Sequence, residues 1–310
     1  MLAELLPPSG TTGDLLNVDF NNRAVGVYNP NDIRTDFQVD MNGKNDPTWD
    51  VQYMSIVPDP VSSGRKNVLS VKRIANQGWS GPGVGGMGFR ADFTRQEDVY
   101  FAYDMYLAPD HEFMRQQKNP GLTYGSLADV GHPDYNTYPT PESLNSFVHV
   151  VTSDSNGAWG RGDGALSTYY YDKERIAGND FWDTADPTFS VGENTGQGGQ
   201  QYHQPRGRWI TVETRVKMNT VTVEGVSGLR DGLQEAWVTD SQLNGGKPLK
   251  VSSQFHKWRV SSSIGIDGIG MAQGYGGNGN DPTNQPSKVQ YHYYDNFRVS
   301  TQPITHGSGI

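Results

Sequence analysis

The chain has 310 residues, a net charge of −9, and 38 Gly, 18 Pro, 16 Tyr and 7 Trp but no Cys. This composition predicts an all-β protein rich in loops, and it excludes disulfides and thiolate metal sites. The acidic charge argues against general nucleic-acid binding, although a local basic groove can still hold a polyanion. No apolar run reaches the roughly 18 residues of a membrane span, so we expect no membrane partner.

The first predicted strand ends at residues 17–22, where Asp19 lies among asparagines. Carboxylates and amides grouped in this way suit a hard cation such as calcium, but the same residue types also form Asx turns. Residues 32–65 are polar and rich in turn formers, which predicts loops with one short strand near 51–57. Residues 78–88 hold six glycines but no Lys-Ser/Thr ending, so they do not form a phosphate loop.

A single lysine stands out in the next part of the chain. Residues 88–93 alternate, with Arg90 on the polar face, either at the surface or in a polar cleft. Residues 99–107 are aromatic and β-branched, as a buried strand should be. Lys118 follows, just before a Pro-Gly pair that predicts a turn. We therefore expect Lys118 to be held at a corner after a strand.

Candidate sugar contacts lie further along the chain. The polar segment 123–144 has the length of a functional loop. The strand expected at 145–151 carries His149 on its apolar side, where a core role and a functional role are equally open. The next loop contains Trp159 and Arg161, a pair able to stack on a sugar and to bind its charge.

Residues 166–173 read as another strand, and its period of two places Tyr169, Tyr171 and Lys173 on one face. Two tyrosines beside a lysine form a catalytic candidate. The cleanest alternation in the chain follows at 208–218, where the polar residues, Glu213 among them, are expected to form a solvated face.

Further strands are expected at 221–226, at 233–238, within 255–277 and at 289–299. This number and spacing of strands fits two packed antiparallel sheets, a β-jelly-roll or concanavalin-like sandwich. No repeat or linker divides the chain, so we predict one domain over 1–310 with its core at about 17–300. A linear polymer can lie along the concave sheet of such a sandwich.

Several fragments, taken in order, resemble polysaccharide lyase family 14, the alginate and glucuronate lyases. The fragments are Ser70-Val71-Lys72, Gly85 to Ala91, Tyr100 to Tyr106, Lys118-Asn119-Pro120-Gly121-Leu122, Gly207-Arg208-Trp209, Asn219-Thr220, Trp237-Val238, Tyr275-Gly276-Gly277 and Tyr294 to Phe297. The resemblance spans about residues 68–300 and extends to related jelly-roll glucuronan lyases. It implies a jelly-roll lyase, a monomer without an organic cofactor, that acts on an acidic polysaccharide.

This chain departs from the family pattern at two places. Gln116-Gln117 stand where the family usually has glycines before its lysine. The family also expects an arginine on the following strand, yet no Lys or Arg occurs between Lys118 and Arg161, and His149 lies roughly on that strand.

β-Elimination at a uronic acid needs a cation that neutralises the carboxylate, a base that removes the neighbouring proton, and an acid that protonates the leaving oxygen. The resemblance and the residue types assign the first role to Lys118, with Arg90 as the alternative. Tyr169 or Tyr171 would be base and acid, and His149 would be a further polar contact. Residues expected to bind the substrate are Arg90, Trp159, Arg161 and Lys173.

Two other functions are open. A glycoside hydrolase needs two carboxylates at a defined separation, and the strands offer no Glu-x-Asp-x-x-Glu pattern. A non-catalytic carbohydrate-binding protein would use the same aromatic residues as a sugar platform. The resemblance further suggests that Asp19 and Asp295 hold a structural calcium that ties the first strand to the last. The size of a polymeric substrate suggests a secreted or periplasmic protein, although residues 1–6 show no signal-peptide pattern.

Overall fold

The computed structural model describes residues 13–38, 51–77, 85–114, 116–124, 146–153, 164–170, 190–191, 200–275 and 285–305. A larger sheet contains β1 (Asp14–Val18), β2 (Gly26–Val27), β3 (Met54–Pro58), β4 (Asn67–Arg73), β6 (Asp98–Leu107), β12 (Trp209–Lys217), β15 (Gly232–Asp240), β16 (Leu249–His256) and β18 (Gln290–Ser300). A smaller sheet contains β5 (Met87–Gln96), β7 (Gln116–Tyr124), β8 (Ser146–Ser153), β9 (Ala165–Tyr170) and β17 (Ile266–Tyr275).

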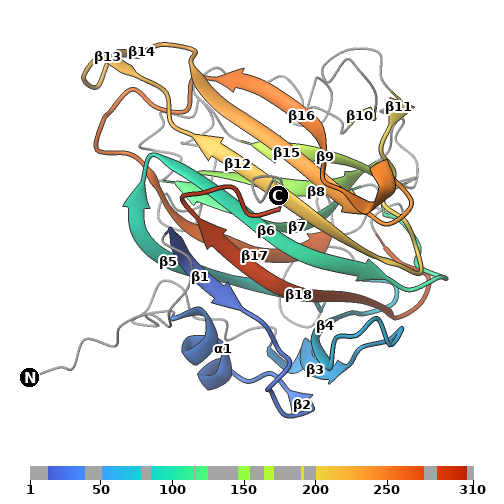
Figure 1. The fold of residues 1–310 in the computed structure, drawn as a ribbon. Coiled ribbons are helices and arrows are strands. Elements are labelled where there is room, and N and C mark those ends of the chain that lie inside the picture. Colours follow the sequence, from blue (N-terminus) through green and yellow to red (C-terminus); the bar gives the residue numbers. More distant parts are fainter. Residues whose placement is uncertain are drawn as a thin grey trace, which may run out of the picture.

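The two sheets are antiparallel and stacked, with β7, β8 and β9 drawn behind β12 and β15 (Figure 1). The strand order is β16-β15-β12-β6-β18-β4-β3-β2 in the nine-stranded sheet, where β1 also pairs with β18, and β5-β17-β7-β8-β9 in the five-stranded sheet. The predicted all-β jelly-roll sandwich is thereby confirmed. The first and last strands of the larger sheet are partners, since Val18 is registered with Phe297.

Short elements complete the described fold. Two small strand pairs lie outside the main sheets, β10 (Ser190–Val191) with β11 (Gln200–Gln201), and β13 (Val221–Val223) with β14 (Ser227–Gly228). The helical elements are α1 (Pro30–Phe37) and two 3₁₀ turns, η1 (Val51–Tyr53) and η3 (Asn244–Gly246). Within the described ranges, no helix is long and apolar enough to cross a membrane.

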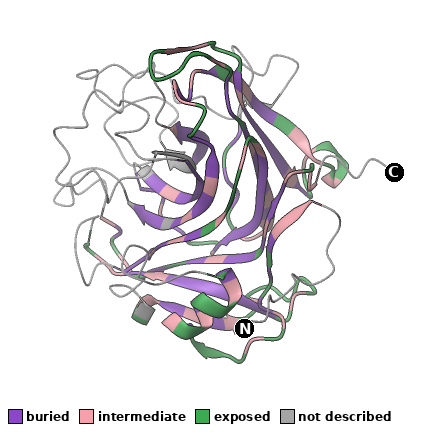
Figure 2. Ribbon diagram, turned by 90° about the vertical axis from the view of Figure 1, so that its left-hand side faces the viewer, coloured by how far each residue is buried: buried purple, intermediate pink, exposed green. Residues whose placement is uncertain are grey.

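The core lies between the sheets and is strongly aromatic. Phe297 of β18 has its ring centroid 5.6 Å from that of Phe37, 5.8 Å from Tyr103 and 6.4 Å from Phe101. Leu122 of β7 and other fully buried side chains of the five-stranded sheet join the same cluster. Figure 2 shows buried residues along the strands, whereas exposed residues gather on the helix and the loops. The period-two alternation of the strands therefore gives each sheet one apolar inner face.

Helix α1 contradicts the expectation of loops over this part of the chain. Its N-cap is Asn29, whose side chain accepts hydrogen bonds from the backbone N–H of Asn31 at 2.9 Å and of Asp32 at 3.1 Å. The carboxylate of Asp32 accepts in turn from the Asn29 N–H, which completes a capping box. Burial of Ile33 and Phe37 against the core then holds this short helix in place.

The solvated face expected for β12 is also wrong at Glu213, which is fully buried. Its carboxylate accepts hydrogen bonds from the N–H of Ile304 at 2.9 Å and the N–H of Thr305 at 2.7 Å. The C-terminal residues cross this face of the sheet (Figure 1) and cover the glutamate. Alternation correctly assigned Glu213 to the face away from the core, but it could not indicate that the chain's own end covers that face.

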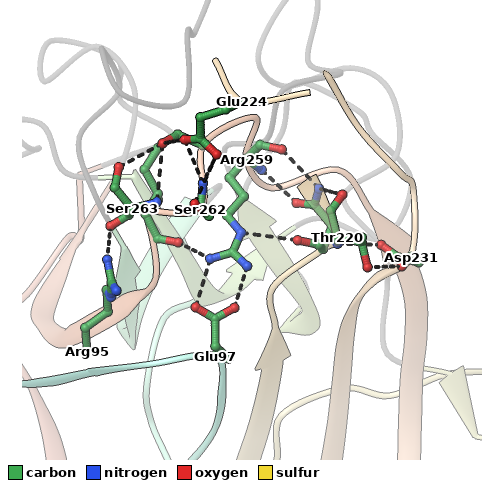
Figure 3. A network of polar contacts seen from close by, with 11 residues as sticks. Arg95, Glu97, Thr220, Glu224, Asp231, Arg259, Ser262 and Ser263 are labelled. Carbon is green, nitrogen blue, oxygen red and sulfur yellow. Dashed lines mark hydrogen bonds and ion pairs between the residues drawn. The ribbon is translucent and has the colours of Figure 1, made fainter. Parts of the chain in front are cut away.

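An ion-pair network fixes one end of the sandwich (Figure 3). Arg259, which follows β16, donates from Nη1 to Glu97 Oε1 at 2.9 Å, and Glu97 joins β5 to β6. Asn219 accepts from the Arg259 N–H at 2.8 Å and donates to its carbonyl at 3.0 Å. The guanidinium also donates to the carbonyl of Ile264. These contacts join the ends of β5, β12 and β16 just before β17 begins.

Candidate functional site

The candidate site lies on the face of the five-stranded sheet that points away from the nine-stranded sheet, here called the outer face. On β9 the hydroxyl of Thr168 donates to Gln234 of β15 at 3.4 Å, so Thr168 faces inward. Leu166 belongs to the core cluster and faces the same way. Because strand side chains alternate, Ser167 and Tyr169 lie on the outer face.

A transverse row of five residues crosses this sheet, one from each strand. Arg90 of β5 is registered with Gly270 of β17, Gly270 with Gly121 of β7, Gly121 with His149 of β8, and His149 with Tyr169 of β9. Two glycines therefore occupy the middle of the row, where a strand glycine permits close approach of another molecule to the backbone. The side chain of His149 lies outside the described part of the structure.

A β-bulge places Lys118 on the outer face. Lys118 is registered with Val151, and Gly121 with His149. Between these two pairs β7 therefore contains one residue more than β8. In a regular strand, residues 118 and 121 would lie on opposite faces; the extra residue brings them to the same face. The turn expected at the Pro-Gly pair is therefore wrong, because β7 continues through it to Tyr124. Proline is tolerated at a bulge, where one ladder hydrogen bond is already missing.

Lys118 and Tyr169 meet across the intervening strand β8. The Lys118 Nζ atom lies 5.3 Å from the centroid of the Tyr169 ring, within range of a cation–π interaction. Lys118 is half-buried, and Tyr169 is 4% exposed. Burial lowers the pKa of Lys118 to about 8. The site therefore holds an ammonium group that has lost much of its hydration and that binds an anion more strongly than a surface lysine does.

Arg90 lies on the same face but already contacts two carboxylates. Its Nη2 donates to Asp267 at 2.6 Å, and its Nε donates to Asp92. Gly268 lies beneath it, and a Cβ atom added there would be 2.9 Å from Arg90 Nε. Burial raises the pKa of Asp267. Arg90 thus has a fixed position at one end of the row, with a side chain only 14% exposed.

Sequence reasoning identified Lys118, Tyr169 and Arg90, and the register brings all three to one face. It missed Asp267, Gly121 and Gly270. The signal for the glycines was present, since glycine inside a strand often marks close approach of another molecule, but sequence alone does not reveal that Gly121 and Gly270 are neighbours. Four further predicted residues lie outside the described residues: Tyr171, Trp159, Arg161 and Lys173.

The two aspartates predicted to bind calcium lie near the paired ends of the chain. Asp19 accepts a hydrogen bond from the Asn21 N–H at 3.0 Å, the Asx turn considered as the alternative. Asp295 accepts from the Phe20 N–H at 3.4 Å and lies 3.4 Å from Arg65, and burial raises its pKa to about 6. In the ranges that the structure describes, no group of three or more His, Asp or Glu residues could hold a metal. The calcium site stays a prediction.

The sequence matches no protein-family model and no curated protein. Solved structures do match. Alginate lyase Aly36B superposes with a TM-score of 0.63 at 18% identity, over 94% of this chain and 97% of that one. The PL-14 alginate lyase from Aplysia kurodai gives 0.58 at 17% identity, over 92% and 98%. This chain has the fold of those alginate lyases.

A third alginate lyase, vAL-1 from a Chlorella virus, gives a TM-score of 0.52 at 18% identity, over 83% of this chain and 90% of that one. Aly36B has also been solved as a mutant, with a lysine and a tyrosine replaced by alanine, in complex with an alginate tetrasaccharide. At these identities the likeness establishes the fold alone.

Proposed function

We propose that this protein is a polysaccharide lyase that cleaves a uronate polymer, of the alginate or glucuronan type, by β-elimination. The observation that supports this most directly is the partly buried ammonium group of Lys118 beside Tyr169 on the outer face. A partly dehydrated cation next to a phenol can stabilise the negative charge that develops when a proton is removed beside a carboxylate. The fold shared with alginate lyases supports the same reading.

Each residue has a distinct role in this proposal. Lys118 binds the uronate carboxylate and neutralises the charge that forms on it. Tyr169, as a phenolate beside that cation, takes the proton from the carbon next to the carboxylate. The C–H electron pair becomes a carbon–carbon double bond, the bond to the glycosidic oxygen breaks, and the tyrosine returns the proton to the leaving oxygen. His149 and Tyr171 are proposed as further polar contacts of the reacting sugar.

The glycines of the transverse row suit a linear substrate. Gly270 is part-exposed and has no side chain, so a sugar ring can approach the backbone beside Arg90. We propose that Arg90 binds a second charged sugar, and that Trp159, Arg161 and Lys173 extend the binding surface. A polymer of this kind also suggests a place of action outside the cytoplasm.

The test is ultraviolet absorbance of the unsaturated product, recorded with alginate, glucuronan, ulvan and a neutral glucan. We expect a rise with one uronate polymer and none with the glucan. Lys118→Met and Tyr169→Phe should each abolish the rise. Lys288→Met is the matched control, since Lys288 is an exposed lysine paired with Asp110. If absorbance rises with none of the four polymers although a polymer still binds, the protein is the non-catalytic carbohydrate-binding alternative and not a lyase.

A further inference from the structure

The residues on either side of Lys118 are both amides buried in the core. Gln117 and Asn119 are 0% exposed. The hydroxyl of Tyr294 donates to Asn119 Oδ1 at 3.0 Å, and Gln117 Nε2 lies 3.2 Å from His292 Nδ1. Tyr294 and His292 both belong to β18 of the opposite sheet and point toward β7. The strand segment that carries Lys118 is therefore bonded to the nine-stranded sheet on both sides of the lysine.

A second histidine completes the contacts of Gln117. His111 Nε2 lies 3.0 Å from Gln117 Oε1, and the ring centroids of His111 and His292 are 4.8 Å apart. An amide donates from nitrogen and accepts at oxygen, so His292 must accept at Nδ1 while His111 donates from Nε2. Burial lowers the pKa of both rings, that of His111 to about 4, so both are neutral near pH 7. Both ends of the Gln117 amide are then fixed.

We propose that Gln117, Asn119, His292 and Tyr294 act as a clamp that fixes the bulge of β7 and so positions Lys118 on the outer face. A bulge lacks part of its ladder hydrogen bonding, and a slip of one residue would turn the lysine toward the core. With the residues before and after it bonded inward, the lysine must point outward. These four are positioning residues, and their catalytic meaning rests on the proposed function.

Ordinary core packing does not explain the clamp. Apolar side chains would fill the same space without the cost of desolvating two amides and an imidazole. A buried polar contact fixes one arrangement of the chain where apolar contacts allow several, and the Gln117 amide is bonded at both its nitrogen and its oxygen. The clamp contacts the residues on both sides of Lys118, at the bulge whose register determines whether the lysine lies on the outer face.

The experiment measures the pKa of Lys118 itself, so it does not depend on turnover. Lysines of the full chain are labelled by reductive methylation with 13C, and their resonances are followed between pH 6 and 11. The Lys118 signal is the one that titrates well below the others and disappears in Lys118→Met. Tyr294→Phe removes only the hydroxyl that bonds Asn119. Tyr103→Phe is its matched control: this buried ring lies 6.0 Å from Tyr294, and in the described structure its hydroxyl has no hydrogen-bond partner.

We expect Tyr294→Phe to move the Lys118 titration upward, toward the usual 10.5 of lysine, because a relaxed bulge lets water reach the ammonium group. Its kcat should fall about tenfold with KM within twofold, as misplacement of a reacting group predicts. Tyr103→Phe should change neither. Asn119→Leu, which removes the acceptor of the Tyr294 hydroxyl, should shift the titration in the same direction as Tyr294→Phe.

Gln117→Met provides an independent test should Tyr294→Phe fold poorly, with circular dichroism as the check on folding. An unchanged Lys118 titration and kcat in folded Tyr294→Phe and Gln117→Met would overturn the clamp. A shifted titration in a protein that cleaves no polymer would support the clamp and reject the lyase. If the protein is active but neither substitution changes the titration of Lys118, the lyase is supported and the clamp is rejected.

Discussion

Replacing Lys118 with methionine should abolish turnover and, at the same time, stabilise the fold at neutral pH. Burial lowers the pKa of this lysine from 10.5 to about 8, so the folded protein holds the charge at a cost. At about 1.4 kcal/mol for each pKa unit, that cost is on the order of 3 kcal/mol. Because the side chain is half-buried and its charge contacts the Tyr169 ring, we expect only about 1 to 2 kcal/mol to be recovered.

The pH dependence of this gain follows from proton linkage. With its pKa lowered in the folded state, Lys118 binds fewer protons folded than unfolded between about pH 8 and 10.5. The parent protein therefore gains stability as pH rises through that window, and the methionine variant does not share that gain. The advantage of Lys118→Met should be full below pH 8 and should shrink toward pH 10.5.

Urea unfolding at pH 7 and at pH 10 measures both effects, with Lys288→Met as the control. The control lysine is exposed and paired with Asp110, so its replacement should change the free energy of unfolding by less than about 0.5 kcal/mol. A loss of 1 kcal/mol or more in Lys118→Met at pH 7 would refute the reasoning. A gain of equal size at both pH values would show that it does not come from the buried charge.

Three further predictions concern pH and substrate binding. In pH–rate profiles on the preferred polymer, the kcat/KM of the parent protein should fall above about pH 8, where Lys118 of the free enzyme loses its proton. The fall in kcat should come at higher pH, because a bound carboxylate raises the pKa of the lysine again. The free energy of unfolding should decrease as pH drops from about 6.5 toward 4, because His111 and His292 have lowered pKa values and bind fewer protons in the folded state than in the unfolded state. Urea unfolding at pH 7 and pH 5 measures this decrease, which should be smaller in His111→Gln. Arg90→Met should raise KM several-fold more than it lowers kcat, and an unchanged KM would remove Arg90 from substrate binding.

Strand alternation predicted much of the fold, because residues that face a core must repeat with the period of the strand. The segments expected at 88–93, 145–151 and 208–218 correspond to β5, β8 and β12. Helix α1 was missed although its signals are local: Asn29 before a proline, with Asp32 at the third helical position, is a capping box. The polar composition around these residues indicated a loop more strongly than the cap indicated a helix.

Sequence patterns singled out candidate residues but not the geometry that brings some of them together. The sequence does not reveal that Lys118 and Tyr169 come together, because their strands are separated by β8. The Pro-Gly pair after Lys118 has the local signature of a turn. Beside the bulge of β7, however, Asn119 and Gln117 contact the side chains of Tyr294 and His292, which lie more than 170 residues away in sequence. Local patterns carry no information about such distant partners.

The two faces of β7 together limit the pH range in which the proposed chemistry can operate. On the outer face, Lys118 carries its charge only below about pH 8 before substrate binds. On the inner face, His111 and His292 are neutral in the folded state, and their tendency to take up protons favours unfolding as pH falls below the usual histidine pKa of about 6.5. A cation that must stay charged thus lies on one face of β7, and two histidines that must stay neutral lie against the other face. The interval between these limits, near neutral to slightly alkaline pH, is where the lysine is charged and the bulge is held at full stability.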